Sequence, residues 1–206
     1  MTASSQYFSI HPVNPQPRLL QRAAEIIRAG GLVVYPTDTT YALGCHLGDK
    51  NAAERIRQIR QLDKNHYLTM TCRDLSQIAT YARVSDPDYR ILRKLTPGPF
   101  TFLLPATREV PKRLLHPKRR TIGLRVPDHP IALGLLEALG EPMMTTTMQL
   151  PGEELPLSDP EVIRERLSAR VDVILDGGAC GLTPTTVVDL TGEAPEVIRQ
   201  GLGEFV

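Results

Sequence analysis

Short apolar segments of strand length alternate with amphipathic helical segments along this chain of 206 residues. Residues 19–27 carry apolar side chains at helical spacing, and Gly30 and Gly31 follow them as glycines do at a helix C-terminus. Residues 32–36 then form a buried-looking strand. This alternation predicts an α/β fold. Because the connections are too varied for a regular βαβ array, we expect a twisted sheet of mixed parallel and antiparallel strands with helices on its faces.

The same patterns place the remaining elements. Further strands are predicted at residues 67–72, 100–104, 121–126, 143–148, 171–176 and 186–190, with an edge strand at 196–199. Helices are predicted at residues 51–62 and 129–139, from near Asp74 and Asp86 (with Pro87 at the first helical position), and from the capping sequence Ser158-Asp159-Pro160-Glu161 to about residue 169. The 18 prolines fall at these boundaries and do not form a linker. We therefore expect one domain over residues 1–206, with its core at about 14–203.

Composition and charge exclude several classes of protein. The formal net charge is +1, so any nucleic-acid surface must come from local segregation of charge. Three widely spaced cysteines argue against a disulfide framework and suit a reducing compartment. The five histidines show no metal-ligand spacing, and no apolar run is long enough to span a bilayer. These features predict a cytoplasmic protein without a structural metal and without a membrane partner.

A cluster of hydroxyl groups follows the strand at residues 32–36. Residues 35–41 read Tyr-Pro-Thr-Asp-Thr-Thr-Tyr. A later segment, Pro184-Thr185-Thr186-Val187-Val188-Asp189, likewise combines a proline, adjacent threonines and an aspartate. Strand ends of open α/β sheets deliver side chains to the crevice where ligands bind. The alternative is a polar strand end in which Pro36 and Asp38 form a turn. No Walker A or Gly-x-Gly-x-x-Gly sequence is present, and the glycine-rich residues 176–181 suit either a ligand loop or a tight turn.

Positive side chains gather in two places. Seven lie between residues 108 and 125, where Glu109 is the only acid, and a second group lies on the helix at residues 51–62. Such groups can neutralise phosphate on a nucleotide or along an RNA backbone, or they can simply form a solvated loop. Aromatic content of 5% without tryptophan argues against recognition of single strands by base stacking. That argument does not apply to contact with the backbone of a structured RNA, which needs no base stacking.

Several segments together resemble one known family. In order along the chain they are Gly30-Gly31, residues 35–44, the basic helix, Pro97-Gly98-Pro99-Phe100-Thr101, and residues 121–130, 144–152, 176–189 and 197–201. These segments resemble the YrdC/YciO family of threonylcarbamoyl-AMP synthase-like proteins. Residues 41–45, 57–62 and 70–75 are most similar to its YciO branch.

The resemblance implies a YrdC/RibB-like twisted sheet over a large concave basic groove. It implies binding of ATP, L-threonine and bicarbonate, with Mg²⁺ carried on the ATP and no protein-bound structural metal. It also implies the synthesis of threonylcarbamoyl-AMP, a nucleotidyl transfer that serves the modification of adenosine 37 in tRNA. The alternative within the family is a protein that binds double-stranded RNA or tRNA without turnover.

The resemblance assigns roles to individual residues, none of them a catalytic acid or base. The residues expected to bind L-threonine are Thr37, Arg125 and Thr185. Those expected to bind the nucleotide are Arg60, Lys64, Thr121, Thr145, Thr147, Gln149 and Arg199. Those expected to bind RNA are Lys112, Arg113, Lys118, Arg119 and Arg120.

Two motifs depart from the pattern of demonstrated synthases. Their Lys-x-Arg pair corresponds here to Arg60 and Leu62, and their Ser-x-Asn corresponds to Thr147 and Gln149. Loss of a phosphate-facing cation would weaken a site that works by electrostatics, by roughly 2.7–4 kcal/mol if it resembles the loss of one oxyanion donor.

Arg125 carries the sharpest prediction. Alternation along residues 121–126 places Thr121, Gly123 and Arg125 on one face of a strand. We expect Arg125 to hold the carboxylate of threonine, so that Arg125→Lys weakens threonine binding with little change in stability. The alternative is an ion pair between Arg125 and a neighbouring acid such as Asp128.

Overall fold

Ten strands form a single sheet in the computed structural model, which describes residues 5–63, 66–115 and 118–205. Their order across the sheet is β1-β8-β2-β3-β7-β4-β6-β5-β9-β10. The strands are β1 (Gln6–Ser9), β2 (Val33–Pro36), β3 (Tyr41–His46), β4 (Thr69–Thr71), β5 (Phe100–Pro105), β6 (Thr121–Arg125), β7 (Met143–Thr147), β8 (Val173–Asp176), β9 (Thr186–Asp189) and β10 (Glu196–Arg199).

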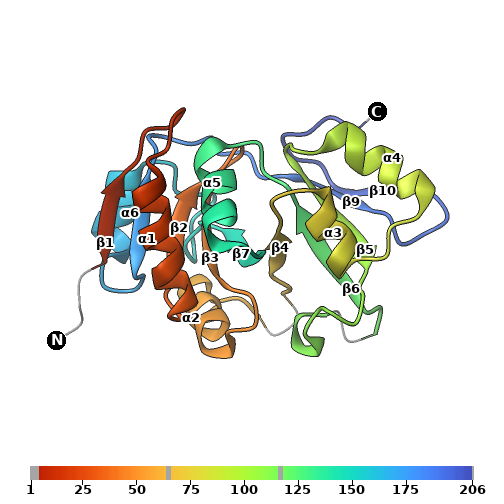
Figure 1. Cartoon of the computed structure of the whole chain (residues 1–206), viewed down its shortest axis with the longest axis horizontal. Helices are drawn as coiled ribbons and strands as arrows, with labels where there is room; N and C mark the ends of the chain where they lie inside the picture. Colours follow the sequence, from red (N-terminus) through yellow and green to blue (C-terminus); the bar gives the residue numbers. More distant parts are fainter. Residues whose placement is uncertain (1–4, 64–65, 116–117, 206) are drawn as a thin grey trace.

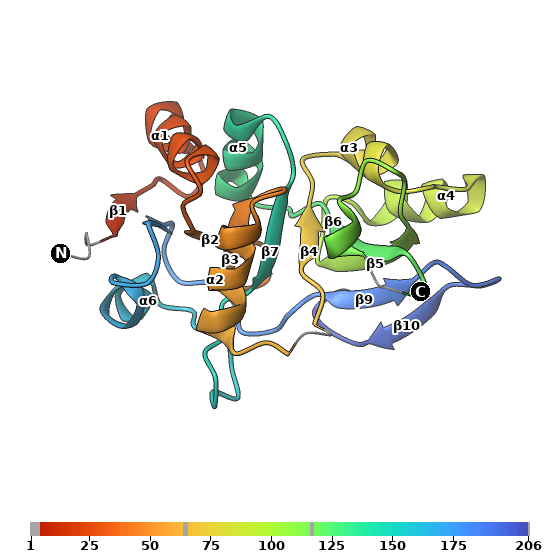
Figure 2. The same ribbon diagram turned by 90° about the horizontal axis from the view of Figure 1, so that it is seen from below.

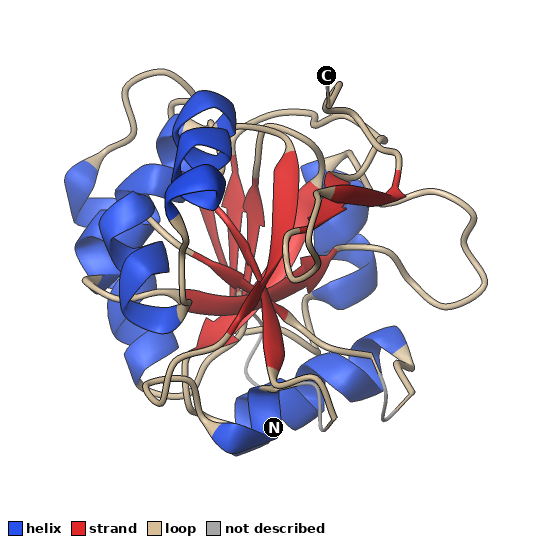
Figure 3. Ribbon diagram, turned by 90° about the vertical axis from the view of Figure 1, so that its right-hand side faces the viewer, coloured by secondary structure: helices blue, strands red, loops and turns tan. Residues whose placement is uncertain are grey.

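The sheet is mixed and strongly twisted. β1 and β2 pair in parallel with β8, β4 pairs in parallel with β6, and β5 pairs in parallel with β9. The other neighbours are antiparallel. Seen end-on, the strands fan out around the centre of the molecule with helices along their flanks (Figure 3). The predicted α/β architecture is confirmed.

Six α-helices are present in the described part of the chain. They are α1 (Pro17–Arg28), α2 (Lys50–Arg60), α3 (Leu75–Tyr81), α4 (Asp86–Leu95), α5 (Pro130–Leu139) and α6 (Pro160–Leu167), with a 3₁₀ turn at Lys112–Leu114. Gly30, with φ of 89°, and Gly140, with φ of 79°, follow α1 and α5 in the left-handed region that suits glycine. α1 and α5 lie side by side in two perpendicular views (Figures 1 and 2). No helix in the described ranges is long and apolar enough to cross a membrane.

The two faces of the sheet are covered differently. One apolar cluster joins alternate strand residues such as Leu43, Met70 and Met144 to helices α2, α3, α4 and α6. A second cluster joins Val33 and Val173, among others, to α1 and α5. Because successive side chains of a strand point to opposite faces, the neighbours of Met70 and Met144 point away from the first cluster. Of these neighbours, Met143 packs in the second cluster, whereas Thr69, Thr71 and Thr145 line a cavity on the same face of the sheet.

Some expected details of the elements are wrong. β1 and β3 were not among the predicted strands, because β1 is a short edge strand and β3 follows directly on the hydroxyl cluster, where turn residues dominate the pattern. Helix α4 is capped by Ser85, in a capping box with Asp88, and not by Asp86. Helix α6 is capped by Asp159, whose carboxylate accepts from the Glu161 amide, and not by Ser158.

Candidate functional site

A cavity of about 390 Å³ opens on the uncovered part of the sheet. Its floor comes from strands β2 to β7 and β9, with Arg199 added from β10. Eight threonines line it, which are Thr40, Thr69, Thr71, Thr101, Thr145, Thr146, Thr147 and Thr185. Thr69 and Thr71 flank the buried Met70, and Thr145 follows the buried Met144, so strand alternation alone directs hydroxyl groups into the cavity. A lining of hydroxyls suits a polar ligand with many hydrogen-bond acceptors and donors.

Three arginines line the same cavity from three separate elements. Arg60 ends α2, Arg125 ends β6, and Arg199 ends β10. Burial lowers the pKa of Arg60 and of Arg199, because each guanidinium has lost part of its hydration. The Nε atoms of Arg60 and Arg125 are buried without a hydrogen-bond partner among the described residues. Cations with lost hydration and unused donors favour an anionic ligand.

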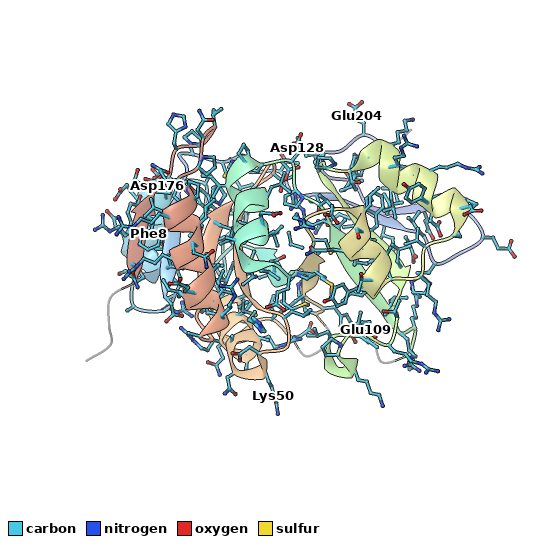
Figure 4. The ribbon with its side chains drawn as sticks, in the orientation of Figure 1. Phe8, Lys50, Glu109, Asp128, Asp176 and Glu204 are labelled. Carbon is cyan, nitrogen blue, oxygen red and sulfur yellow. The ribbon has the colours of Figure 1, made fainter. Side chains whose placement is uncertain are left out.

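Arg125 forms a buried ion pair, but its partner is Asp38 and not Asp128. The Nη2 atom of Arg125 lies 2.5 Å from Oδ1 of Asp38, and Nη1 donates to Oγ1 of Thr39 at 3.3 Å. Asp128, the acid suggested by its proximity in sequence, is exposed in the connection between β6 and α5 (Figure 4). The predicted alternation is confirmed for Gly123 and Arg125, which both line the cavity.

The threonine hydroxyls are ordered by mutual hydrogen bonds. Oγ1 of Thr71 and Oγ1 of Thr145 lie 2.7 Å apart, and Oγ1 of Thr101 and Oγ1 of Thr185 lie 2.9 Å apart. Arg199 donates from Nη2 to the carbonyl of Thr185 at 2.8 Å and to its hydroxyl at 3.2 Å. These contacts join β4 to β7 and join β5 and β10 to the segment before β9. They fix the positions of the polar groups before any ligand enters.

Two residues expected in the site do not line the cavity. The hydroxyl of Thr37 donates to the carbonyl of Thr40 at 2.6 Å and accepts from the amides of Thr39 and Thr40, so it shapes the turn between β2 and β3. Thr121 lies at the start of β6, paired with Pro105, and outside the lining. Lys64 lies outside the described residues.

The segment expected to bind RNA lies outside the cavity as well. Lys112, Lys118, Arg119 and Arg120 are exposed between β5 and β6, and the side chain of Arg113 is not described. The Arg119 guanidinium lies 3.9 Å from the carboxylate of Asp189. The structure therefore separates the positive charge into a set that lines the cavity, where Arg125 is buried, Arg60 half-buried and Arg199 exposed, and a second set at the surface outside it.

The lining of the cavity includes four residues that were not predicted from the sequence. Glu154, Leu155 and Pro156 line it from the loop after β7, and Leu182 lines it from the loop after β8. Leu155 and Leu182 are 57% and 42% exposed. An isolated leucine in a loop gives no periodic signal, so nothing in the sequence distinguished these two from any other exposed residue.

Gln149 belongs to the same loop. Arg60 donates to its carbonyl, and its side-chain amide donates to the carbonyl of Glu153 at 2.8 Å. The side chain of Leu62 is absent from the lining and packs against the first apolar cluster. Residue 62, where the resemblance predicts the loss of a cation, thus adds an apolar contact to the core.

The cysteines give no support for nucleophilic catalysis. Cys45 and Cys72 are buried, and burial raises the pKa of Cys72. Burial also raises the pKa of Cys180 to about 11, so its thiol is protonated at neutral pH. Within the described ranges, no group of three or more His, Cys, Asp or Glu side chains is placed to hold a metal ion.

Comparisons with known proteins agree with this geometry. The family described as Telomere recombination, which unites Sua5, YciO and YrdC proteins, matches residues 25–201. The YciO protein of Escherichia coli K12 is 56% identical over 200 residues, covering 97% of each chain, and its crystal structure superposes with a TM-score of 0.93. The threonylcarbamoyl-AMP synthase of Pyrococcus abyssi is 33% identical over 181 residues, or 87% of this chain and 53% of that protein.

A second solved structure, of a relative, contains a bound ligand. The Sua5 protein of P. abyssi in complex with L-threonine has a TM-score of 0.87 at 28% identity, covering 96% of this chain and 58% of that one. Both the sequence and the structure of the present chain therefore match across nearly its whole length. The chain belongs to the Sua5/YciO/YrdC family.

Proposed function

We propose that this protein binds L-threonine, bicarbonate and ATP in the cavity and joins them into threonylcarbamoyl-AMP, releasing pyrophosphate. One observation carries the proposal, which is that three arginines and eight threonines from separate elements converge on a single cavity. Relatives named threonylcarbamoyl-AMP synthase, and a relative solved with L-threonine, support the same reading. The product would serve the threonylcarbamoyl modification of adenosine 37 in tRNA.

The proposed chemistry needs positioning and positive charge more than acid-base groups. Bicarbonate first takes up a proton and loses water to give carbon dioxide, and the amino group of threonine then adds to this carbon dioxide and releases a proton, which gives a carbamate. A carbamate oxygen then forms a bond to the α-phosphorus of ATP, and the bond to the β-phosphate oxygen breaks, so pyrophosphate leaves. Arg60 and Arg199 would stabilise the phosphate charge, and Arg125 would hold the carboxylate of threonine through its unpartnered Nε.

Magnesium would enter on the triphosphate of ATP. Glu154 is the one carboxylate among the described residues of the lining, so the donors present suit a metal carried by phosphate oxygens better than a resident ion. When bound, Mg²⁺ would supply charge neutralisation at the phosphates.

The test is pyrophosphate release by the purified protein. Release should require threonine and bicarbonate together, with ATP and magnesium present, and labelled threonine should appear in an adenylate. Arg199→Ala should abolish the release while leaving the protein folded, because in the described contacts this guanidinium donates only to the carbonyl and the hydroxyl of Thr185. Release that is independent of threonine would contradict the proposal.

A second function, binding of tRNA or double-stranded RNA without turnover, is favoured by the exposed basic segment. Lys118, Arg119 and Arg120 are consecutive and exposed, and the Arg119 guanidinium lies 3.9 Å from the carboxylate of Asp189. RNA affinity should then fall steeply with salt, because neutralised phosphates release counterions. Lys118→Glu with Arg119→Glu should weaken RNA binding and leave ATP binding intact. RNA binding that is insensitive to this pair of changes would contradict the second function.

A further inference from the structure

Strand β10 forms one outer edge of the sheet (Figure 2). It pairs with β9 on one side, and all four of its residues are exposed. The two residues in its middle, Val197 and Ile198, are large and apolar, yet they are 38% and 52% exposed. An exposed edge strand with apolar side chains is a template for pairing with another strand. The register of β10 shows which strand fits it.

A β-bulge determines which side chains of β10 share a face. Glu196 lies opposite Asp189 of β9. Arg199 lies opposite Val187, so three steps along β10 correspond to two steps along β9. Residues two apart in a strand share a face, and so do residues directly opposite in an antiparallel pair. Glu196 and Arg199 therefore both project from the face of the sheet that bears the cavity, which Val187 and Arg199 line.

This bulge makes the strand complementary to itself. Without the extra residue, side chains three positions apart would project from opposite faces. With it, two copies of β10 that pair antiparallel about a two-fold axis place Glu196 of one copy opposite Arg199 of the other, and symmetry repeats the contact. Opposite charges directly across a strand pair are stabilising. In the same register Val197 of each copy lies opposite Ile198 of the other, which joins the exposed apolar side chains at the centre.

Both charged groups have capacity left for this contact. In the described contacts the exposed carboxylate of Glu196 has no ion pair or hydrogen bond. Arg199 donates to Thr185 through Nη2, which leaves Nε and Nη1 to donate elsewhere. A bulge ordinarily protects an edge, because a regular strand does not match it. A second copy carries the same extra residue and does match it.

We propose that the protein forms a two-fold symmetric dimer in which the β10 strands of two copies pair antiparallel, with Glu196 of each copy against Arg199 of the other. The sheet then continues through both copies. Because Arg199 also lines the cavity, the interface borders one wall of it. The dimer does not depend on the proposed reaction, since no ligand of the cavity takes part in the contact.

Sedimentation equilibrium over about 1–500 µM protein tests the dimer, because a short edge buries little surface and pairs weakly. The measured mass should rise with concentration from that of one chain toward twice that value. Glu196→Arg and Arg199→Glu each place like charges across the interface, so each should raise the dissociation constant at least about tenfold. Circular dichroism and thermal unfolding check that both variants are folded. A wild-type protein that keeps the mass of one chain over the whole range would overturn the proposal.

A mixture of the two variants identifies the pairing itself. Glu196→Arg carries positive charge at both positions and Arg199→Glu carries negative charge at both, so each repels its own copies. An equal mixture matches at both contacts and should dimerise about as tightly as the wild type. Ile198→Asp should also weaken the wild-type dimer, whereas Val13→Asp, at an apolar residue that is 68% exposed, should not. A dimer that both charge reversals leave intact, or a mixture that stays monomeric, would overturn the proposal.

Discussion

The guanidinium of Arg125 and the carboxylate of Asp38 form an ion pair of 2.5 Å, although 87 residues separate them in the sequence. Both side chains are about nine-tenths buried, at 10% and 11% exposure. The pair joins the end of β6 to the turn between β2 and β3, so it fastens the hydroxyl-rich turn to the opposite half of the sheet. The same guanidinium faces the cavity, which gives Arg125 a structural and a ligand-binding role at once.

Removal of Arg125 should therefore destabilise the protein. Arg125→Ala should lower the free energy of unfolding by about 3 kcal/mol, because it leaves the buried Asp38 carboxylate without its partner. Chemical denaturation of the two proteins measures the difference. Arg73→Ala is the matched control, since Arg73 pairs with Asp74 and Glu137 at the surface and its loss should cost less than about 1 kcal/mol. Equal costs for the two variants would contradict the role given to the buried pair.

The conservative change tests the ligand role separately. Arg125→Lys should weaken binding of L-threonine by about tenfold, because a lysine has no separate donor in the place of Nε that could contact the threonine carboxylate while the cation is held by Asp38. The buried pair alters the expectation for stability, which sequence alone predicted to stay almost constant. We now expect Arg125→Lys to lower the free energy of unfolding by more than Arg73→Ala does and by less than Arg125→Ala does, because the shorter lysine side chain reaches Asp38 less well. Unchanged threonine affinity in a folded Arg125→Lys protein would refute the assignment.

The pH dependence of nucleotide binding should depend on His66, which lines the cavity. Partial burial is the main cause that lowers the pKa of this imidazole below its ordinary value of 6.5, and the charge of Arg60 adds to it. The free protein thus holds a neutral ring at pH 7. Bound phosphate would offset the charge of Arg60 and raise the pKa, so binding would take up a proton.

The sign of the effect follows from that uptake. Affinity for ATP should rise as the pH falls from about 7.5 to about 6, relative to a His66→Gln protein titrated with the same ligand. The comparison with His66→Gln cancels the titration of the phosphates themselves. Parallel pH profiles for the two proteins would show that His66 does not feel the bound anion.

Local patterns were sufficient to predict most of the fold. The alternation along residues 121–126 predicted that Gly123 and Arg125 share one face, and both line the cavity, whereas Thr145 and Thr147 were expected in the site from the family resemblance. The edge strand β1 was not predicted, because its four residues, Gln6–Ser9, are at most partly buried and show no clear period. Strand β3 was not predicted, because residues 37–40 look like the end of strand β2. The chain turns there and returns at once as β3, the antiparallel neighbour of β2.

Contacts in the site between residues that are far apart in the sequence could not be predicted from the sequence. The sequence suggested Asp128 as a partner for Arg125 because the two are close along the chain, whereas the twist of the sheet brings Asp38 there. The turn hydroxyl of Thr37 looked free in the sequence, yet the backbone of the same turn uses it. Position along the chain cannot show which polar groups satisfy one another inside a fold.

The position of Thr185 should depend on Gly201. A Cβ at residue 201 would lie 2.3 Å from the carbonyl oxygen of Pro184 and 2.4 Å from the carbonyl carbon of Thr185. Gly201→Ala must therefore displace the segment that carries the Thr185 hydroxyl into the cavity, and we expect it to weaken ATP and threonine binding together. Gly192→Ala is the matched control, because its nearest neighbour, the Ala194 carbonyl, lies at an ordinary 3.6 Å. Equal binding by both variants would contradict the expected displacement.

The departures at Leu62 and Gln149 should limit the rate of the proposed reaction. A Leu62→Arg, Gln149→Asn protein should release pyrophosphate with threonine and bicarbonate at least about tenfold faster than the wild type, because it regains a cation near the phosphates. The change at residue 149 also frees the loop from its contact with the Glu153 carbonyl. Leu62→Gln, Gln149→Asn is the control, since it makes residue 62 polar without adding charge, and it should show no gain. If the arginine variant folds, binds ATP and still shows the wild-type rate, the two departures do not set the activity of this protein.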